Sequence, residues 1–240
     1  MSALGDAIVY LNDPFNWSKP GGISHLLGQH LAISGAAVAA AAVIGIPAGA
    51  LLGHSGRGGG AVVALSNVSR AIPTLALLTV FAVTPIGFGP VATTIALALF
   101  ALPPILSNTY VGFRGVDRDL VEAARAMGMT SGQVLLRAEL PMAAGLLMTG
   151  VRTAAVQVVA TATLAALVAG GGLGELINLG FGQQDYGVVL AGAVLVAALA
   201  VVTELVLAAL SWLLTPGEKR LPFGRARRAR PAVAGAAAQR

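Results

Sequence analysis

The sequence predicts an all-α integral membrane protein with about five transmembrane helices in one domain. Only 10% of its 240 residues are charged, 56% are hydrophobic, and the mean hydropathy is +0.82. A soluble domain carries about 25% charged residues, so this chain has too little polar surface to cover a water-soluble globule. Cysteine is absent, which excludes disulfides and thiolate metal sites.

Three apolar runs reach the roughly 20 residues that a helix needs to cross a bilayer. They cover residues 31–52, 143–169 and 188–214. The first has no charge, the second contains Arg152 and Gln157, and the third contains Glu204. We expect each run to form one transmembrane helix.

Two weaker runs lie between the first and second of these. One covers residues 72–84 and can extend back through 61–68, and the other covers 91–106 and ends near a pair of prolines. The intervening TPIGFGP, residues 84–90, has the glycines and prolines of a tight turn at the membrane edge. Five spans are therefore expected.

The positions of lysine and arginine predict an external N-terminus and a cytoplasmic C-terminus, given five spans. All but two of the 15 fall in the inner segments, the exceptions being Lys19 outside and Arg152 within a span. Positive charge at the inner membrane surface also argues against a nucleic-acid partner. Asp6 and Asp13 precede the first span, where a signal peptide would carry a basic segment.

The chain thus divides into three expected parts within the cell membrane. Residues 1–24 form an external N-terminal segment, 25–214 form the transmembrane domain, and 215–240 form a basic cytoplasmic tail. The tail contains GEKRLPFGRARRAR, which suits an anchor on anionic lipid, and a regulatory role for it remains open. Its last residues have the composition of a disordered segment.

The stretch EAARAMGMTSGQVLLRAELP, residues 122–141, is a polar island in the loop between the third and fourth spans. Asp117 or Asp119 can cap a helix at its N-terminus. An apolar face at helical spacing follows, made by Leu120, Ala123, Ala124 and Met127.

A glycine turn and a second short helix complete this expected cytoplasmic loop. Gly128 can end the first helix in the left-handed conformation, Ser131 can cap the second helix, and Pro141 limits it. An amphipathic helix lying on the membrane prefers bulky apolar residues. Ala123 and Ala124 instead favour close approach to another protein.

The island resembles the EAA motif of ABC importer permeases, whose pattern is EAA, three residues, Gly, nine residues, then I-x-L-P. The matching positions are Glu122, Ala123, Ala124, Gly128, Leu140 and Pro141. Ala138 stands where the pattern has Ile. Six positions at fixed spacing in a loop before the penultimate span make a specific match.

Other segments resemble the osmoprotectant branch, whose members import glycine betaine, choline, carnitine or proline. These segments are LNDPFNW, AIPTLALLTVF, LPPILSNTYVGFRGVD, GVRTA and TATLAALVAGGGLGELI. The resemblance spans residues 8–215. It implies a type I permease whose loop docks in a groove of a cytoplasmic ATPase subunit. It also implies an extracytoplasmic substrate-binding protein and a similar, non-identical second permease.

The chain is not expected to be an enzyme or to bind a cofactor itself. A P-loop needs G-x-x-x-x-G-K-[ST], and neither of the two lysines, Lys19 and Lys219, lies in that pattern. ATP must therefore be bound by a partner. The glycine runs at 56–60 and 170–174 are expected to be flexible connections, and the second also matches the family at an external gate or binding-protein contact.

Substrate affinity is also expected to come from a partner. Aromatic faces hold quaternary ammonium groups best, and the chain has only two tryptophans and three tyrosines, with no cluster inside the membrane. The histidines His25, His30 and His54 show no metal-binding spacing.

Arg152 and Glu204 are the only charges expected inside spans. Each lies about ten residues from the inner end of its span, or roughly 15 Å deep. A lone charge there costs at least ~2.5–3.5 kcal/mol, so an interhelical ion pair is one hypothesis and a pore-lining role the other.

The leading functional hypothesis is the permease subunit of an ATP-driven importer of compatible solutes, working by alternating access. A methionine-type or other amino-acid ABC permease is the close alternative. An ion-coupled secondary transporter would need acids in the membrane, where only Glu204 qualifies, and usually an internal repeat. A non-transporting scaffold would not explain the loop motif.

Overall fold

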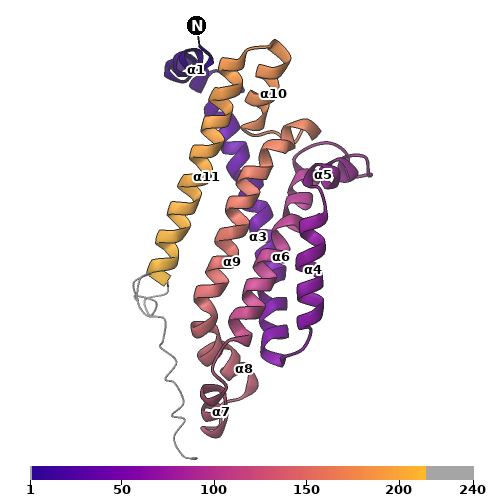
Figure 1. Ribbon diagram of the computed structural model, residues 1–240, viewed down its shortest axis with the longest axis vertical. Coiled ribbons are helices and arrows are strands. Elements are labelled where there is room, and N and C mark those ends of the chain that lie inside the picture. Colours follow the sequence, from indigo (N-terminus) through magenta and orange to yellow (C-terminus); the bar gives the residue numbers. More distant parts are fainter. Residues whose placement is uncertain (1, 215–240) are drawn as a thin grey trace, which may run out of the picture.

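The computed structural model describes residues 2–214, including all side chains except those of 68–71 and 214. The described chain is helical throughout and has no strand (Figure 1). The expected basic tail, 215–240, lies outside the described residues. The helices in chain order are α1 (Ala3–Asn12), α2 (Pro14–Ser18), α3 (Ile23–Ser55), α4 (Gly59–Ala71), α5 (Thr74–Ala82), α6 (Pro90–Arg114), α7 (Arg118–Ala126), α8 (Ser131–Gln133), the π-helix η1 (Val134–Glu139), α9 (Leu140–Thr161), the 3₁₀ helix η2 (Ala162–Val168), α10 (Gly174–Gln183) and α11 (Tyr186–Leu214).

Four described helices are long and apolar enough to cross a membrane. They are α3, α6, the continuous helix Ser131–Val168 and α11. They correspond to the first, third, fourth and fifth expected spans. The loop with α7 and α8 lies at one end of the bundle, and α1 and α10 lie at the other (Figure 1).

The expected second span is not one helix. α4 has 13 residues and α5 has nine, with Ile72 and Pro73 extended between them. At 1.5 Å per residue these helices are about 20 and 14 Å long, and each is shorter than the roughly 30 Å hydrocarbon core. Proline disfavours the helical conformation in the residue before it, which explains the break.

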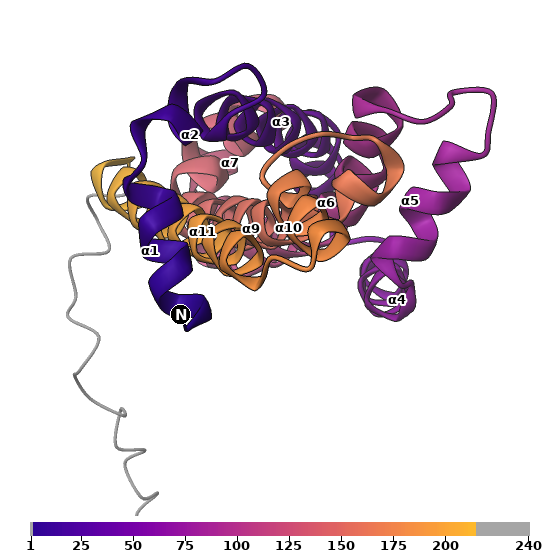
Figure 2. The same cartoon turned by 90° about the horizontal axis from the view of Figure 1, so that it is seen from above.

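The run 72–84 holds one helix, α5, but its extension through 61–68 is the separate helix α4, and a count of five single-helix spans is not confirmed. α4 and α5 together still return the chain from the loop end to the end where α6 begins (Figure 1). Both lie on the side of the bundle opposite α1 and α11 (Figure 2).

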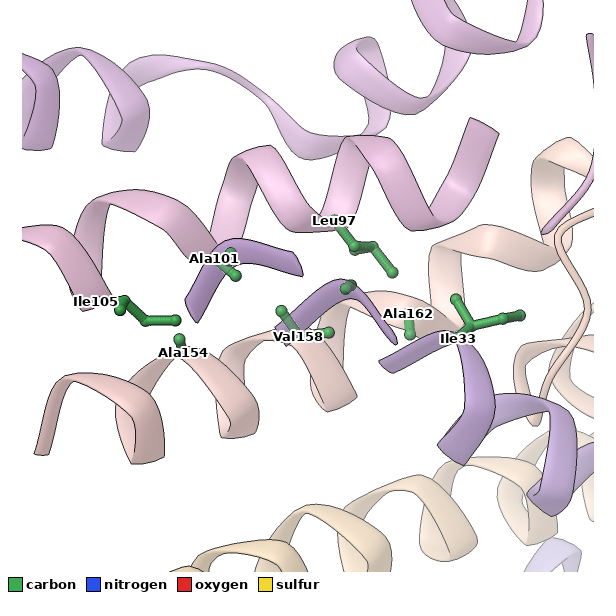
Figure 3. Close-up of a cluster of buried hydrophobic side chains, with 9 residues drawn as sticks. Ile33, Leu97, Ala101, Ile105, Ala154, Val158 and Ala162 are labelled. Carbon is green, nitrogen blue, oxygen red and sulfur yellow. The ribbon is translucent and has the colours of Figure 1, made fainter. Parts of the chain in front are cut away.

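The core lies between α3, α6 and α9. Ile33, Leu97, Ile105 and Val158 meet there among small alanines (Figure 3). Small residues let membrane helices approach closely, and dispersion forces then hold them together. Gly49 of α3 shows how close this packing is, because a Cβ there would lie 2.7 Å from the carbonyl oxygen of Leu106.

Candidate functional site

Helix α7 of the polar loop begins and ends as its sequence predicts. Asp117 caps it by accepting a hydrogen bond from the Asp119 backbone N–H to Oδ1, at 3.0 Å. The helix ends at Ala126, and Gly128 follows with φ +84°. Only glycine takes this left-handed conformation without cost, so the residue type at 128 is set by the turn.

The four residues of the expected apolar face of α7 differ in exposure. Among its four residues only Ala124 is buried, whereas Leu120 is 41% and Met127 77% exposed. Val121 and Ala124 form the buried side and pack against Val134. The loop thus has a small core of its own, and α7 presents a second side outward.

The exposed surface of α7 carries the first two residues of the EAA motif. Glu122 and Ala123 are exposed, as are Leu120 and Met127 along the same helix. None of these exposed side chains is needed to fill the loop's own core. Leu120, Ala123 and Met127 form a surface that we call the α7 outer face, and Glu122 is exposed on another side of the helix.

Thr130, not Ser131, caps the second helix. Its Oγ1 accepts from the Gln133 N–H at 3.4 Å, and Gln133 Oε1 accepts from the Thr130 N–H at 2.9 Å, which is a capping box. The hydroxyl of Ser131 lies instead 2.7 Å from Nε2 of His54. Thr130 and Ser131 can both cap a helix. Which of them does so depends on His54, which lies 77 positions away from Ser131 in the sequence.

Pro141 does not end the second helix. The chain runs from α8 through the π-helix η1 into α9 without a break, and Pro141 lies in the first turn of α9. A π-turn shifts hydrogen bonding by one residue, so it can absorb a residue that has no N–H. Leu140 packs at the same junction against Phe113 and Ala143. The loop is therefore joined rigidly to the fourth span.

A buried carboxylate at this junction escaped the sequence analysis. Glu139 is 1% exposed, and its Oε2 lies 2.6 Å from Nδ1 of His54, in the last turn of α3. A carboxylate only accepts, so Nδ1 carries the proton and donates. The two residues are 85 positions apart, so no spacing rule could pair them. The one sequence feature that could have drawn attention to Glu139 is its position directly before the first span-forming residues of α9.

The two charges inside the membrane lie together. Arg152 Nε is 3.0 Å from Glu204 Oε1, which joins α9 to α11. Their side chains are 37% and 41% exposed in the single chain, so the pair lies at the edge of the bundle and not in its core. Each charge is the direct electrostatic partner of the other.

The glycine run at 170–174 is fixed and not flexible. All five residues are buried, and Gln29 Oε1 accepts from the Gly172 N–H at 3.2 Å. His30 is fully buried and accepts from the Leu173 N–H at Nδ1, so its Nε2 donates to the Val159 carbonyl at 2.9 Å. The histidine therefore ties α3 to both ends of the 3₁₀ segment that leads out of α9.

Comparison with known proteins places these features in a family. Residues 41–213 match the family described as binding-protein-dependent transport system inner membrane component. The chain belongs to this family. The matched part holds the polar loop, His54, Glu139, and the Arg152–Glu204 pair, whereas α1 and α2 precede it.

Several characterised permeases are similar over most of their length. The carnitine transport permease protein OpuCB of Listeria monocytogenes is 40% identical over 78% of this chain and 86% of its own. The choline transport system permease protein OpuBB of Bacillus subtilis is 37% identical over 80% and 89%. The osmoprotectant import permease protein OsmW of Salmonella typhimurium is 33% identical over 88% and 98%.

The fold is that of a type I ABC importer permease. The inward-facing MetNI methionine ABC transporter contains a chain that superposes with a TM-score of 0.71 over 85% of this chain and 99% of that one. At 24% identity this likeness concerns the fold alone. The binding-protein-dependent permease described here is therefore a multi-pass membrane protein and a component of an ABC importer.

Proposed function

We propose that this permease imports compatible solutes, namely the quaternary ammonium compounds glycine betaine, choline and carnitine, together with proline. The names of relatives at 33% to 40% identity support this substrate class. The observation that carries the mechanism is the polar loop. It stands at one end of the bundle, has its own core, and presents an outer face that its own fold does not use.

The α7 outer face is where a cytoplasmic ATPase subunit docks. Exposed Leu120, Ala123 and Met127 offer apolar contact, and the exposed Glu122 offers a negative charge on another side of the same helix. The side chain of Ala123 is small, so the ATPase subunit can approach the α7 backbone closely there. ATP is bound and hydrolysed by that partner, and this chain needs no cofactor of its own.

Movement of α7 reaches the membrane along two routes. Val121 and Ala124 press on Val134 of η1, which continues directly into α9. Glu139 then links the same segment to His54 at the end of α3. When ATP closes the ATPase dimer, both spans follow the loop, and the solute pathway changes the side to which it opens.

The loop end faces the cytoplasm in this proposal, with the N-terminus outside. Arg57, Arg114, Arg118, Arg125 and Arg137 all belong to segments at the loop end. Positive charge collects on the cytoplasmic side of membrane proteins. A second, similar permease completes the pathway, and an extracytoplasmic binding protein delivers the solute.

Reconstitution of the whole transporter tests this function. The permease, its partner permease, the ATPase and the binding protein are placed in proteoliposomes with labelled glycine betaine, choline, carnitine, proline and methionine. We expect uptake of the quaternary ammonium solutes that requires both ATP and the binding protein. Uptake driven by an ion gradient without ATP, or uptake of methionine alone, would overturn the proposal.

A further inference from the structure

A polar cavity of about 260 Å³ lies between α4, α6 and α9, among helices that are otherwise apolar. Its polar lining comes from all three helices: Ser66, Ser107, Asn108, Thr153 and Gln157, with Phe100 beside them. The volume is close to the lower end of small-ligand sites, which are roughly 300–1,000 Å³. None of the described side chains that line it is titratable.

The α9 wall of this cavity belongs to a row of polar side chains along the helix. Thr149, Thr153, Gln157 and Thr161 follow one another at four-residue spacing, which places them on one face of the helix. The two outer threonines bond back to their own helix, Thr149 to Gly145 and Thr161 to the Gln157 carbonyl.

The two inner members of this stripe, which line the cavity, behave differently. Neither the Thr153 hydroxyl nor the Gln157 carboxamide makes a hydrogen bond to any described part of the chain. Both side chains are exposed in the single chain. Inside a bilayer such groups need water, a solute or another protein as a partner.

The α6 wall adds acceptors and an aromatic face. Pro103 and Pro104 have no N–H, so the helix loses two backbone donors at the level of the cavity. Asn108 Nδ2 donates to the Pro104 carbonyl at 2.8 Å, and the Asn108 carboxamide oxygen accepts from no described group. Phe100 supplies a ring face of the kind that attracts quaternary ammonium groups.

We propose that this cavity is a transit site for the transported solute, and that its neutral polar lining is selected for quaternary ammonium compounds of either net charge. The inference rests on the proposed function. Choline is a cation, whereas glycine betaine and carnitine are zwitterions. A fixed carboxylate would hold the cation and repel the carboxylate of a zwitterion, and a fixed cation would do the reverse. Carboxamide, hydroxyl and aromatic groups admit both kinds weakly enough for release.

Cysteine labelling tests access and occupancy, because the chain has no cysteine of its own. Thr153→Cys and Gln157→Cys are made singly in the complete reconstituted transporter and treated with a methanethiosulfonate that carries a trimethylammonium group. We expect both cysteines to react with the reagent. Glycine betaine at saturating concentration, together with the binding protein, should slow the reaction, and the modification should block uptake. Ala39→Cys, in an apolar groove between α3, α9 and α11, is the matched control and should show no protection or block.

A charge substitution tests the selectivity. Gln157→Glu should raise choline uptake relative to glycine betaine uptake by about tenfold, since a charge a few ångströms from the solute acts strongly in a site of low dielectric. Gln157→Asn adds no charge and should keep the wild-type ratio even where its uptake rate falls. The ratio is independent of how much transporter assembles.

The failure of this inference is separable from that of the proposed function. If the wild-type complex shows no ATP-driven uptake of either solute, the proposed function fails. If the wild type transports both solutes but neither cysteine reacts, or solute gives no protection, or Gln157→Glu leaves the ratio unchanged, the transit site is overturned. Protection by the partner permease alone, without solute, would identify the cavity as an assembly contact instead.

Discussion

Nδ1 of His54 lies 2.6 Å from Oε2 of Glu139, and this contact joins the end of α3 to the segment between the polar loop and α9. Glu139 is buried, with 1% of its surface exposed. The Ser131 hydroxyl meets the other ring nitrogen at 2.7 Å, so the imidazole is held from both sides.

Removing the histidine should be more damaging than removing the glutamate. His54→Ala leaves a buried carboxylate without its partner, which costs about 3–5 kcal/mol, whereas Glu139→Ala leaves a neutral imidazole that still bonds Ser131. We expect thermal unfolding of the purified complex to fall furthest in His54→Ala. Adding Glu139→Gln to His54→Ala should recover part of the loss, and a double variant worse than either single change would contradict the pairing.

Replacing Gly128 should cost stability through the backbone alone. Its φ is +84°, and a Cβ at this position would meet nothing within 4 Å. A left-handed conformation costs other residues roughly 1–2 kcal/mol, so Gly128→Val should loosen the loop and lower uptake per ATP hydrolysed while the protein still inserts. Gly132→Ala, also in open space but without positive φ, is the control. Equal coupling ratios in the two variants would refute the prediction.

Adjacent alanines of the EAA motif should respond differently to the same change. Ala123 is exposed, so Ala123→Trp should leave unfolding unchanged and abolish co-purification of the ATPase. Ala124 is 5% exposed against Val121 and Val134, so Ala124→Trp overfills the loop core and should cost about 1–3 kcal/mol. Normal ATPase binding by Ala123→Trp would remove the α7 outer face as the docking surface.

The membrane charges should be interchangeable as a pair. Arg152→Glu or Glu204→Arg alone replaces an ion pair whose atoms lie 3.0 Å apart with two neighbouring like charges, and a lone charge at this depth already costs at least ~2.5–3.5 kcal/mol. Each single change should reduce the amount of assembled transporter, measured by purification from membranes. The double swap should restore it. If the swap gives no recovery, the pairing has no energetic role.

Composition and spacing were sufficient to predict the four long spans and the glycine turn of the loop. The second span departs from one continuous helix because Pro73 restricts Ile72 to an extended conformation, which separates α4 from α5. The spacing of α7 did not fix which side packs within the chain, because Leu120 with Met127 and Val121 with Ala124 are both apolar sides. Which side is buried depends on Val134, which belongs to the next helix.

The site residues divide in the same way. The EAA positions follow from local spacing, and equal depth in neighbouring spans suggested Arg152 with Glu204. The bond between His54 and Glu139 depends on how α3 ends beside η1, and the cavity depends on three helices meeting around two prolines. Such contacts are properties of helix packing, which a single sequence does not encode at any fixed separation.

The continuous helix from Ser131 to Val168 has 38 residues, and at a rise of 1.5 Å per residue it is about 57 Å long. It is braced against α3 near both ends, by Glu139 with His54 at one and by Val159 with His30 at the other. Two hydrogen-bonded contacts between the same two helices form a frame that resists their sliding past each other, so neither helix can tilt without the other. The break at Ile72 and Pro73 between α4 and α5 lies outside this frame.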